Sequence, residues 1–211
     1  MPRFAGNFIW QLTNKYGFVI LFVTPDLDEG KMVIKTGKRK KSIEKLYLIG
    51  SLKNKKIREL ANKIRKIGFD VFDDWQAAHP EADDNWRDYE KGRGRPYKEA
   101  LKGHAARHIY EFDKSHLDAS GIAVLICPTG KSGHLEAGYV RGFTEGVTHM
   151  FKKYRGKLIG MKIEKEIKKM YILLDPKVER WDVMYQFADD IFETEGQLIC
   201  QLKKDLKRKR K

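Results

Sequence analysis

Cysteine is scarce in this sequence, and so are long hydrophobic runs. The 211 residues include two cysteines, Cys127 and Cys200, which exclude a disulfide framework and a cysteine-based metal cluster. The longest clearly apolar run, FVILFV at 18–23, is far too short to span a bilayer, and the N-terminus lacks the pattern of a secretory signal. We therefore expect a cytoplasmic location.

Negative charge is also in short supply. The chain has 43 Lys and Arg residues against 29 Asp and Glu residues, a formal net charge of +14. Residues 1–41 carry +5, residues 203–211 carry +6, and the long central part carries only +3. Basic runs such as KTGKRKKS and KKDLKRKRK contact phosphate backbones in some proteins and are solvated tails in more of them. Because no zinc-finger, RRM or helix-turn-helix signature is present, nucleic acid is a secondary candidate partner.

Short apolar runs alternate with segments of helical spacing along most of the chain. The runs that predict buried strands are KLYLIGSL (45–52), DVFDDW (70–75), GIAVLIC (121–127) and KMYILLD (169–175). The clearest helical pattern follows the first run, with apolar residues at Ile57, Leu60, Ala61, Ile64 and Ile67 and a stop at Gly68. This alternation predicts a single α/β domain with a doubly wound, mostly parallel sheet, Rossmann-like or flavodoxin-like, and helices on both faces.

The domain limits follow from where this alternation begins and ends. Residues 42–202 form the predicted α/β domain, residues 1–41 precede it as an arm or strand pair, and residues 203–211 follow it as a basic tail. Inside the domain, residues 76–96 predict a long loop or a broken helix, and the Lys-rich residues 148–169 predict an insertion. Ligands of such sheets bind at the carboxyl ends of the strands, so chemistry is expected in the loops GSLKN, DDWQA and PTGKSG.

The segment CPTGKSGHLEAGYVRG (127–142) places a glycine loop between a strand and a helix. A phosphate-binding P-loop would need a glycine where the sequence has Leu125, inside the strand, so a P-loop is excluded. What is left is a short loop that leads into a helix N-terminus, with Ser132 as a candidate cap and Glu136 about one turn inside. By itself, a glutamate at this position is commonly no more than a favourable helix charge.

Three separated segments, YLIGSL, DKSHLDAS and GKSGHLEAGYVRG, occur in this order around the predicted strands. Together they resemble the nucleoside 2-deoxyribosyltransferase family and its relatives, the deoxynucleoside monophosphate N-glycosidases. The resemblance covers residues 42–202 and implies a doubly wound α/β fold that needs no cofactor and no metal. It also implies a homo-oligomer, because in several family members a residue of a neighbouring subunit completes the pocket.

The resemblance assigns roles to three residues. In the family a carboxylate attacks the anomeric carbon of the deoxyribose as the base departs, and a second carboxyl group protonates the base. Glu136 matches the nucleophile, Asp113 matches the proton donor, and Tyr47 matches a tyrosine whose hydroxyl orients the nucleophile. The residues alone allow other interpretations: Asp113 as the N-cap of a helix beginning at DKSHLDAS, and Tyr47 as an ordinary strand aromatic.

Further residues match the substrate-binding positions. Gly50 and Ser51 in the first loop, and the pair Ser132 and Gly133 in the later loop, would let the backbone approach the sugar and its 5′ end. Asp74 and Trp75 are candidates for the base pocket, with a capping Asp and a half-buried Trp as the alternative.

Two histidines attract attention because they lie four residues apart. His104 and His108 would share one face of a helix, but a metal would want a third ligand, so we interpret them as pocket-lining or structural residues. Lys131, just before Ser132, would attract a phosphate or point to solvent.

The leading hypothesis is an enzyme that cleaves or transfers the N-glycosidic bond of 2-deoxyribonucleosides or their 5′-monophosphates. The reaction would pass through a covalent glycosyl-glutamate, as in retaining glycosidases. The alternative is a non-catalytic protein of the same fold that senses a nucleotide or associates with nucleic acid, and a third option is a ribose-containing substrate. Nothing in the sequence decides between transferase and hydrolase.

Overall fold

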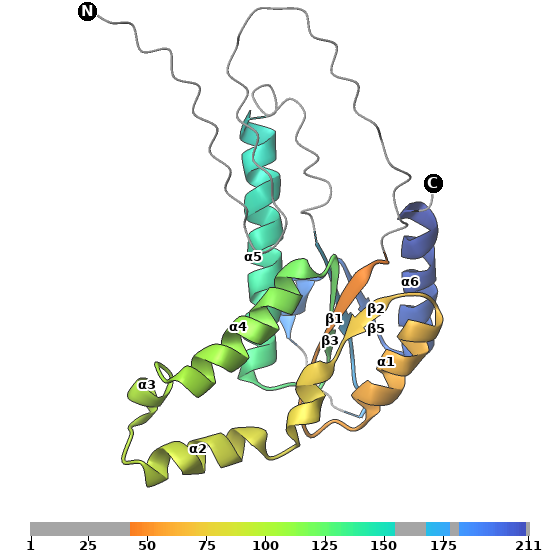
Figure 1. Cartoon of the computed structure of the whole chain (residues 1–211). Coiled ribbons are helices and arrows are strands. Elements are labelled where there is room, and N and C mark those ends of the chain that lie inside the picture. Colours follow the sequence, from red (N-terminus) through yellow and green to blue (C-terminus); the bar gives the residue numbers. More distant parts are fainter. Residues whose placement is uncertain (1–42, 155–167, 178–181, 210–211) are drawn as a thin grey trace, which may run out of the picture. The chain divides into compact units, whose positions relative to one another are not determined.

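The computed structural model describes residues 43–154, 168–177 and 182–209 (Figure 1). The chain divides into two units, residues 1–40 and residues 41–211. The expected arm of residues 1–41 and most of the expected insertion at 148–169 therefore lie outside the described residues. The described helices and strands all belong to the second unit.

Strands and helices alternate in this unit. The strands are β1 (Lys45–Ile49), β2 (Asp70–Phe72), β3 (Ile122–Ile126), β4 (Lys169–Leu173) and β5 (Asp190–Phe192). The helices are α1 (Lys56–Lys66), α2 (Ala82–Gly92), α3 (Tyr97–Ala100), α4 (His104–Ala119), α5 (Lys131–Tyr154) and α6 (Glu195–Lys209), with 3₁₀ turns η1 (Asp74–Ala78) and η3 (Val183–Phe187). None of these described helices is long and apolar enough to span a membrane.

The sheet has the order β2-β1-β3-β4-β5, and all its strands are parallel. The predicted doubly wound α/β fold is thereby confirmed. Strand β2 lies on one side of β1, and β3, β4 and β5 follow one another on the other side. The order reverses between β1 and β3, and in sheets of this kind ligands bind near the loops that follow the two strands at such a point.

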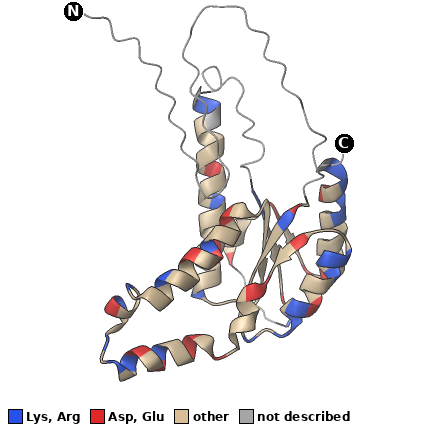
Figure 2. Ribbon diagram, in the orientation of Figure 1, with Lys and Arg blue, Asp and Glu red and all other residues tan. Residues whose placement is uncertain are grey.

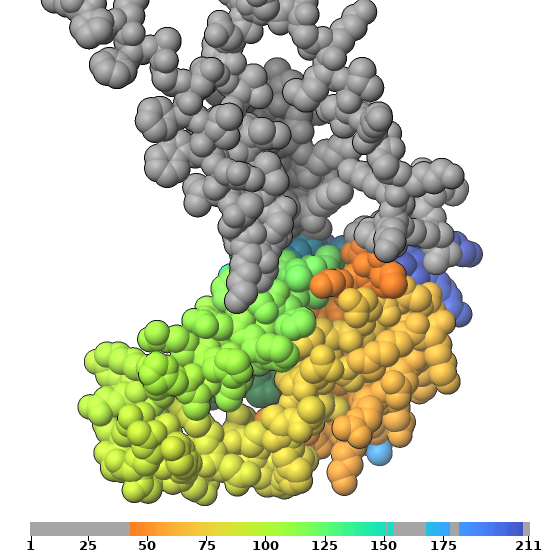
Figure 3. Space-filling view, in the orientation of Figure 1, coloured from red at the N-terminus to blue at the C-terminus, as the bar shows by residue number. Residues whose placement is uncertain are grey.

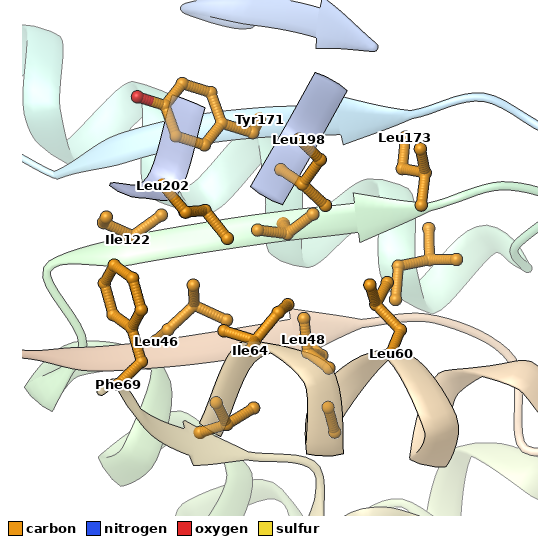
Figure 4. Close-up of a cluster of buried hydrophobic side chains, with 14 of the residues drawn as sticks. Leu46, Leu48, Leu60, Ile64, Phe69, Ile122, Tyr171, Leu173, Leu198 and Leu202 are labelled. Atoms are coloured by element: carbon orange, nitrogen blue, oxygen red, sulfur yellow. The ribbon is translucent and has the colours of Figure 1, made fainter. Parts of the chain in front are cut away.

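Alternating side chains of β1 divide the core between the two faces of the sheet. Leu46 and Leu48 point to one face and pack with α1 and α6, as Figure 4 shows. Tyr47 and Ile49 point to the opposite face, where α4 and α5 cover the sheet (Figure 1). The predicted catalytic residues Tyr47, Asp113 and Glu136, which come from β1, α4 and α5, therefore belong to this second face.

Helix α1 forms as its sequence predicts. Ile57, Leu60, Ala61 and Ile64 are all buried at 0–1% exposure, and they form the stripe that packs on the sheet. Gly68 follows the helix with a φ of 106°, a left-handed conformation that favours glycine. A single turn therefore carries the chain from α1 into β2.

Two local predictions concern the middle and the end of the domain. Of the two alternatives for residues 76–96, a long loop or a broken helix, the broken helix is confirmed, because this segment contains the end of η1 and the 11-residue helix α2. The basic tail is not separate from the domain, because α6 continues to Lys209. Asp205 in this part is buried and accepts a hydrogen bond of 2.7 Å from the Tyr171 hydroxyl. The last turns of α6 are thereby attached to β4.

Candidate active site

Tyr47, Asp113 and Glu136 come from three elements that pack on one face of the sheet. Tyr47 is the central residue of β1 and is 1% exposed. Asp113 lies in the middle of α4, and Glu136 lies in the second turn of α5. Both carboxylates are near enough to Tyr47 for their negative charges to raise the pKa of its hydroxyl. The structure thus brings together three residues that are far apart in the sequence.

Asp113 is not the N-cap of a helix. Helix α4 begins at His104 with Gly103 as its N-cap, and it runs without a break to Ala119. Asp113 is therefore an interior helix residue that is half-buried. The capping interpretation fails because the sequence around GHAARH continues the helix instead of ending it.

The surroundings of the two carboxyl groups favour their neutral forms. Burial is the main reason why the pKa of Glu136 is raised to about 7, and the negative charge of Asp113 acts in the same direction. Burial raises the pKa of Asp113 to about 6. Between these two values the pair holds one proton, so that one carboxyl is ionised while the other can donate.

Tyr47 interacts with the two carboxylates through charge. Burial is the main reason why its pKa is raised, followed by Glu136 and then Asp113, so the hydroxyl stays protonated at every physiological pH. Within the described residues, no direct hydrogen bond links this hydroxyl to either carboxylate. The ring is fixed by stacking on Phe72, with 5.0 Å between ring centroids. A phenol held in this way can act only as a hydrogen-bond donor or acceptor, and not as a base.

An aromatic cluster continues from Tyr47 toward the surface. His116 stacks on Phe72 at 3.9 Å between centroids, and Phe112 meets His116 edge to face at 4.8 Å. Phe112 and His116 lie on α4 beside Asp113, one position before it and three positions after it. The sequence analysis missed them, although His116 at i+3 from Asp113 shares its helix face.

A polar network also joins α4 to α5 next to the carboxyl pair. Tyr139 donates a hydrogen bond of 2.7 Å to Asp118, and Lys114 donates one of 3.0 Å to the Tyr139 hydroxyl. Lys114 pairs with Asp118 as well. Because Lys114 follows Asp113 and Tyr139 lies three residues after Glu136, this network helps to set the separation of the two helices that carry the carboxyls.

Gly50 and Ser51 form the turn after β1, as predicted. The Ser51 hydroxyl accepts a hydrogen bond of 3.3 Å from the Lys53 backbone, and its carbonyl accepts one of 2.9 Å from Asn54. A Cβ at Gly50 would lie 2.4 Å from the Ile57 side chain. Glycine at this position therefore allows the Ile57 side chain of α1 to pack closely on the turn, a structural reason that does not depend on a ligand.

Ser132 and Gly133 lie in the first turn of α5. The helix begins at Lys131, so Ser132 is exposed inside the turn and is not the N-cap that the sequence suggested. Gly133 is buried, and a Cβ there would lie 2.4 Å from the Thr129 hydroxyl oxygen and 3.0 Å from Ile49. This glycine lets the start of α5 pack closely on the sheet.

Asp74 and Trp75 lie in η1, just after β2. The Trp75 indole N–H donates a hydrogen bond of 2.9 Å to the Leu48 carbonyl, and its ring packs against both halves of the core. Asp74 is exposed. The arrangement of Trp75 is that of a half-buried structural tryptophan, which was the alternative to a base-stacking role.

His104 and His108 are both exposed on α4, His104 being its first residue. The described residues contain no group of three or more His, Cys, Asp and Glu side chains that could hold a metal ion. The two histidines are therefore not part of such a group among the described residues.

The surface is hollowed on two sides of the sheet. Figure 3 shows a hollow between α2 and α4, with α5 behind it, on the side of the sheet that α4 and α5 cover. A cavity of about 520 Å³ lies on the other face, at the carboxyl ends of the strands, and is lined among others by Ser51, Asn54 and Cys127. It contains none of the three predicted catalytic residues.

No protein-family model matches this chain, and no curated protein matches it. The assignment of chemistry therefore depends on the site itself. A half-buried carboxyl pair with raised pKa values, beside a protonated phenol, can supply a nucleophile and a proton donor at the same pH.

Proposed function

We propose that this protein is an enzyme that cleaves or transfers the N-glycosidic bond of 2-deoxyribonucleosides or their 5′-monophosphates. The proposal is supported by one observation: Glu136 of α5, Asp113 of α4 and Tyr47 of β1 are close enough to interact through charge. The two carboxyl groups have raised pKa values, and the tyrosine hydroxyl stays protonated. The resemblance in the sequence selects the same three residues.

In the first step the ionised Glu136 attacks C1′ of the sugar. The C1′–N bond breaks as the new C1′–O bond forms, and the electron pair of the broken bond goes to the nitrogen of the base. Asp113 delivers its proton to the departing base, which then leaves as a neutral molecule. Positive charge that develops on the sugar is stabilised by the Glu136 carboxylate.

In the second step the glycosyl ester on Glu136 is resolved. Asp113, now ionised, accepts a proton from water or from a second base as that nucleophile attacks C1′. The ester bond breaks and its electron pair returns to the Glu136 carboxylate, which regenerates the starting state. Water gives a free sugar and makes the protein a hydrolase, whereas a second base gives a new nucleoside and makes it a transferase.

Tyr47 and the aromatic cluster support these steps in the proposal. The Tyr47 hydroxyl, which stays protonated, donates a hydrogen bond to Glu136 once the substrate aligns them, and so fixes the attacking oxygen. Phe112, beside Asp113 and edge to face with His116, offers an aromatic ring against which the departing base stacks.

We also propose that the protein works as a homo-oligomer. Large apolar side chains are exposed on α4 and α5, close to the carboxyl pair: Ile109, Tyr110, Phe112, Leu135, Tyr139 and Phe143. An exposed apolar surface of this kind is typical of a site where another protein binds. A second copy on these helices would cover the side of the active site that faces solvent.

The activity is tested by incubating the protein with each deoxynucleoside and each deoxynucleoside 5′-monophosphate, with and without an acceptor base. Chromatography of free base and free sugar separates hydrolysis from transfer. The expected result is base release by the wild type and a loss of at least about 10³-fold in Glu136→Gln. Binding of a nucleotide without turnover would identify a sensor instead, and full activity in Glu136→Gln would refute the proposal.

A further inference from the structure

Helices α1 and α6 form a basic surface on the face of the sheet opposite the carboxyl pair. They lie side by side (Figure 1), and Lys63 of α1 donates a hydrogen bond of 2.6 Å to Glu195 of α6. Lysine and arginine recur along both helices, as Figure 2 shows. We name the exposed outer side of these two helices the α1–α6 surface.

Cations outnumber anions strongly on this surface. The two helices together contain ten Lys and Arg residues and three Asp and Glu residues. Of these three acidic residues, Glu195 is paired with Lys63, and Asp205 is buried, where Lys169 and Tyr171 contact it. Only Glu59 of these two described helices is then left to oppose the positive charge.

The charge is concentrated at one end of the surface. Both helices follow a strand of the parallel sheet, so both run from the carboxyl edge of the sheet back to its amino edge. In the last turn of α1, Lys63 pairs with Glu195 and Arg65 pairs with Asp73, while Lys66 is exposed beside them. The last turns of α6 expose four cations that point away from the buried Leu202: Lys203, Lys204, Lys207 and Arg208.

Positive charge is also uneven along the sequence. The segments 35–41, 152–169 and 203–211 hold 20 of the 43 Lys and Arg residues and three of the 29 Asp and Glu residues. They carry +17, and the rest of the chain carries −3.

This distribution is not that of a generally basic protein. A chain selected only for solubility would spread its charge over all its surfaces. Here the excess charge belongs to three sequence segments, one of which is the end of α6, and the remainder of the chain, which includes the site, is slightly acidic overall. A helical surface with such an excess of cations attracts an extended polyanion.

Anionic membranes and nucleic acids are both common partners of basic helices. The side chains on the α1–α6 surface indicate which of the two fits better. Binding to an anionic membrane by a basic amphipathic helix needs apolar side chains that insert among the lipids. Neither α1 nor α6 exposes a large hydrophobic residue in the described structure, since theirs are turned into the core. Cations without inserting apolar groups match a sugar-phosphate backbone, which is recognised by charge alone.

We propose that the α1–α6 surface binds the phosphate backbone of nucleic acid, without sequence preference. The bound strand lies on the amino edge of the sheet and on the outer side of α1 and α6, away from Glu136 and Asp113. It is therefore a partner and not the substrate of the site described above. The proposal is independent of whether the protein cleaves an N-glycosidic bond.

The test measures the fluorescence anisotropy of a labelled DNA duplex of arbitrary sequence, titrated with the full chain at several salt concentrations. The test variant replaces Lys203, Lys204, Lys207 and Arg208 by Gln. The matched control replaces four exposed cations of α2, α4 and the residues between them, Lys91, Lys98, Lys102 and Arg107, by Gln. Both variants lose four positive charges, so they differ only in where the charge is removed.

The wild type should bind the duplex with an affinity that falls steeply as salt rises. The test variant should bind at least about tenfold more weakly near physiological salt, and its salt slope should be shallower by about one for each phosphate that is no longer neutralised. The control should remain within about twofold of the wild type. Circular dichroism confirms that both variants are folded, and base release should be unchanged in the test variant.

Three results would overturn the proposal. The first is no binding of the wild type to the duplex at low salt. The second is an equal decrease of affinity in the test variant and the control, which would reduce the effect to net charge. The third is binding to phosphatidylserine-containing vesicles without binding to the duplex, which would identify a membrane surface as the partner. None of these measurements depends on turnover of a nucleoside.

Discussion

Burial raises the pKa values of the Glu136 and Asp113 carboxyl groups above their ordinary values in water. The higher pKa, about 7, belongs to Glu136, and that of Asp113 is about 6, so the single proton of the pair resides mainly on Glu136 before substrate binds. Attack requires the reverse distribution. A sugar whose C1′ becomes positive beside Glu136 stabilises the ionised form of Glu136, and the proton then passes to Asp113 or to the base.

The pH dependence of kcat/KM follows from this pair. We expect a narrow, bell-shaped profile with its maximum between about pH 6 and pH 7. Below that range both carboxyls are protonated and no nucleophile remains, and above it both are ionised and no proton donor remains.

Asp113→Asn provides the check on that profile. The change removes the proton donor, so the alkaline limb should disappear. The acidic limb should remain, because Asp113 is protonated and uncharged there in the wild type and that limb reports the ionisation of Glu136. A profile of Asp113→Asn identical to that of the wild type would mean that Asp113 takes no part in the chemistry.

The same pKa shift predicts a cost in stability. Glu136 has a pKa of about 7 in the folded protein against an ordinary value of 4.5, so the folded state binds more protons than the unfolded state between these values. Stability therefore falls as the pH rises through that window and stays reduced above it. Glu136→Gln should raise the free energy of unfolding by about 1 to 3 kcal/mol at pH 8, and by much less at pH 4.

Urea denaturation at the two pH values measures this difference. Glu99→Gln, at an exposed position of α3, is the matched control and should change stability equally at both. A Glu136→Gln variant that is no more stable than the wild type at pH 8 would show that Glu136 is not held in a desolvating site.

Among the helices and strands, the C-terminal end of α4 is fixed by a buried lysine that precedes β4. The ammonium group of Lys168 donates hydrogen bonds to three backbone carbonyls: those of Leu117 at 3.1 Å, Ser120 at 2.7 Å and Asp118. Positive charge at this end of a helix also interacts favourably with its dipole. Lys168 therefore connects the helix that carries Asp113 to the strand next to β3.

Lys168→Met should destabilise the protein by about 2 to 4 kcal/mol, because it leaves buried carbonyl groups without their donor. The thermal midpoint and the urea midpoint should both fall. Lys102→Met, which removes an exposed cation just before α4, should change stability by less than about 0.5 kcal/mol. Equal stabilities of the two variants would contradict the capping role of Lys168.

The helices and strands also differ in how far their sequence predicts them. Strongly periodic or continuously apolar segments, such as those of α1 and β3, were predicted correctly because burial fixes their pattern. Helix α2 was predicted only as a loop or broken helix because it buries one residue, Glu90, and so lacks an apolar stripe. The N-caps assigned to Asp113 and Ser132 were wrong, since side-chain capping competes with helix continuation and local sequence does not decide between them.

The candidate site could be predicted only in part from the sequence. Glu136, Asp113 and Tyr47 were selected by resemblance, and the topology of the sheet explains why they lie together. Their electrostatic coupling could not be predicted, because it depends on how closely α4 and α5 approach each other. Phe112 and His116 were missed for the same reason: aromatic residues on a helix acquire a role only from the neighbour they stack on.

Across the whole described domain, the two helical layers have different surfaces. The α1–α6 surface is basic, and the α4–α5 face is apolar. On α5, Gly138, Gly142 and Gly146 are spaced by four residues, and a Cβ at any of them would meet no atom within 4 Å. A helix with such a smooth, open side allows another helix to approach closely, which fits association of two copies.

Light scattering after size exclusion should therefore find a dimer or a larger oligomer. Ile109→Glu, which places a charge on the exposed apolar side of α4, should shift the population toward the monomer and weaken the dimer at least about tenfold. Val183→Glu is the control, because Val183 is similarly exposed but lies in η3. A monomeric wild type would contradict the proposed oligomer.

The proposed mechanism depends above all on a covalent bond between Glu136 and the sugar, and mass spectrometry of the acid-quenched protein detects that bond. After reaction with its best substrate, the wild type should gain the mass of one deoxyribosyl or phosphodeoxyribosyl group, and peptide fragmentation should locate that group on Glu136. Asp113→Asn should form the adduct more slowly and also resolve it more slowly, because Asp113 acts in both steps. An active enzyme without any adduct, or with an adduct on another residue, would contradict the mechanism.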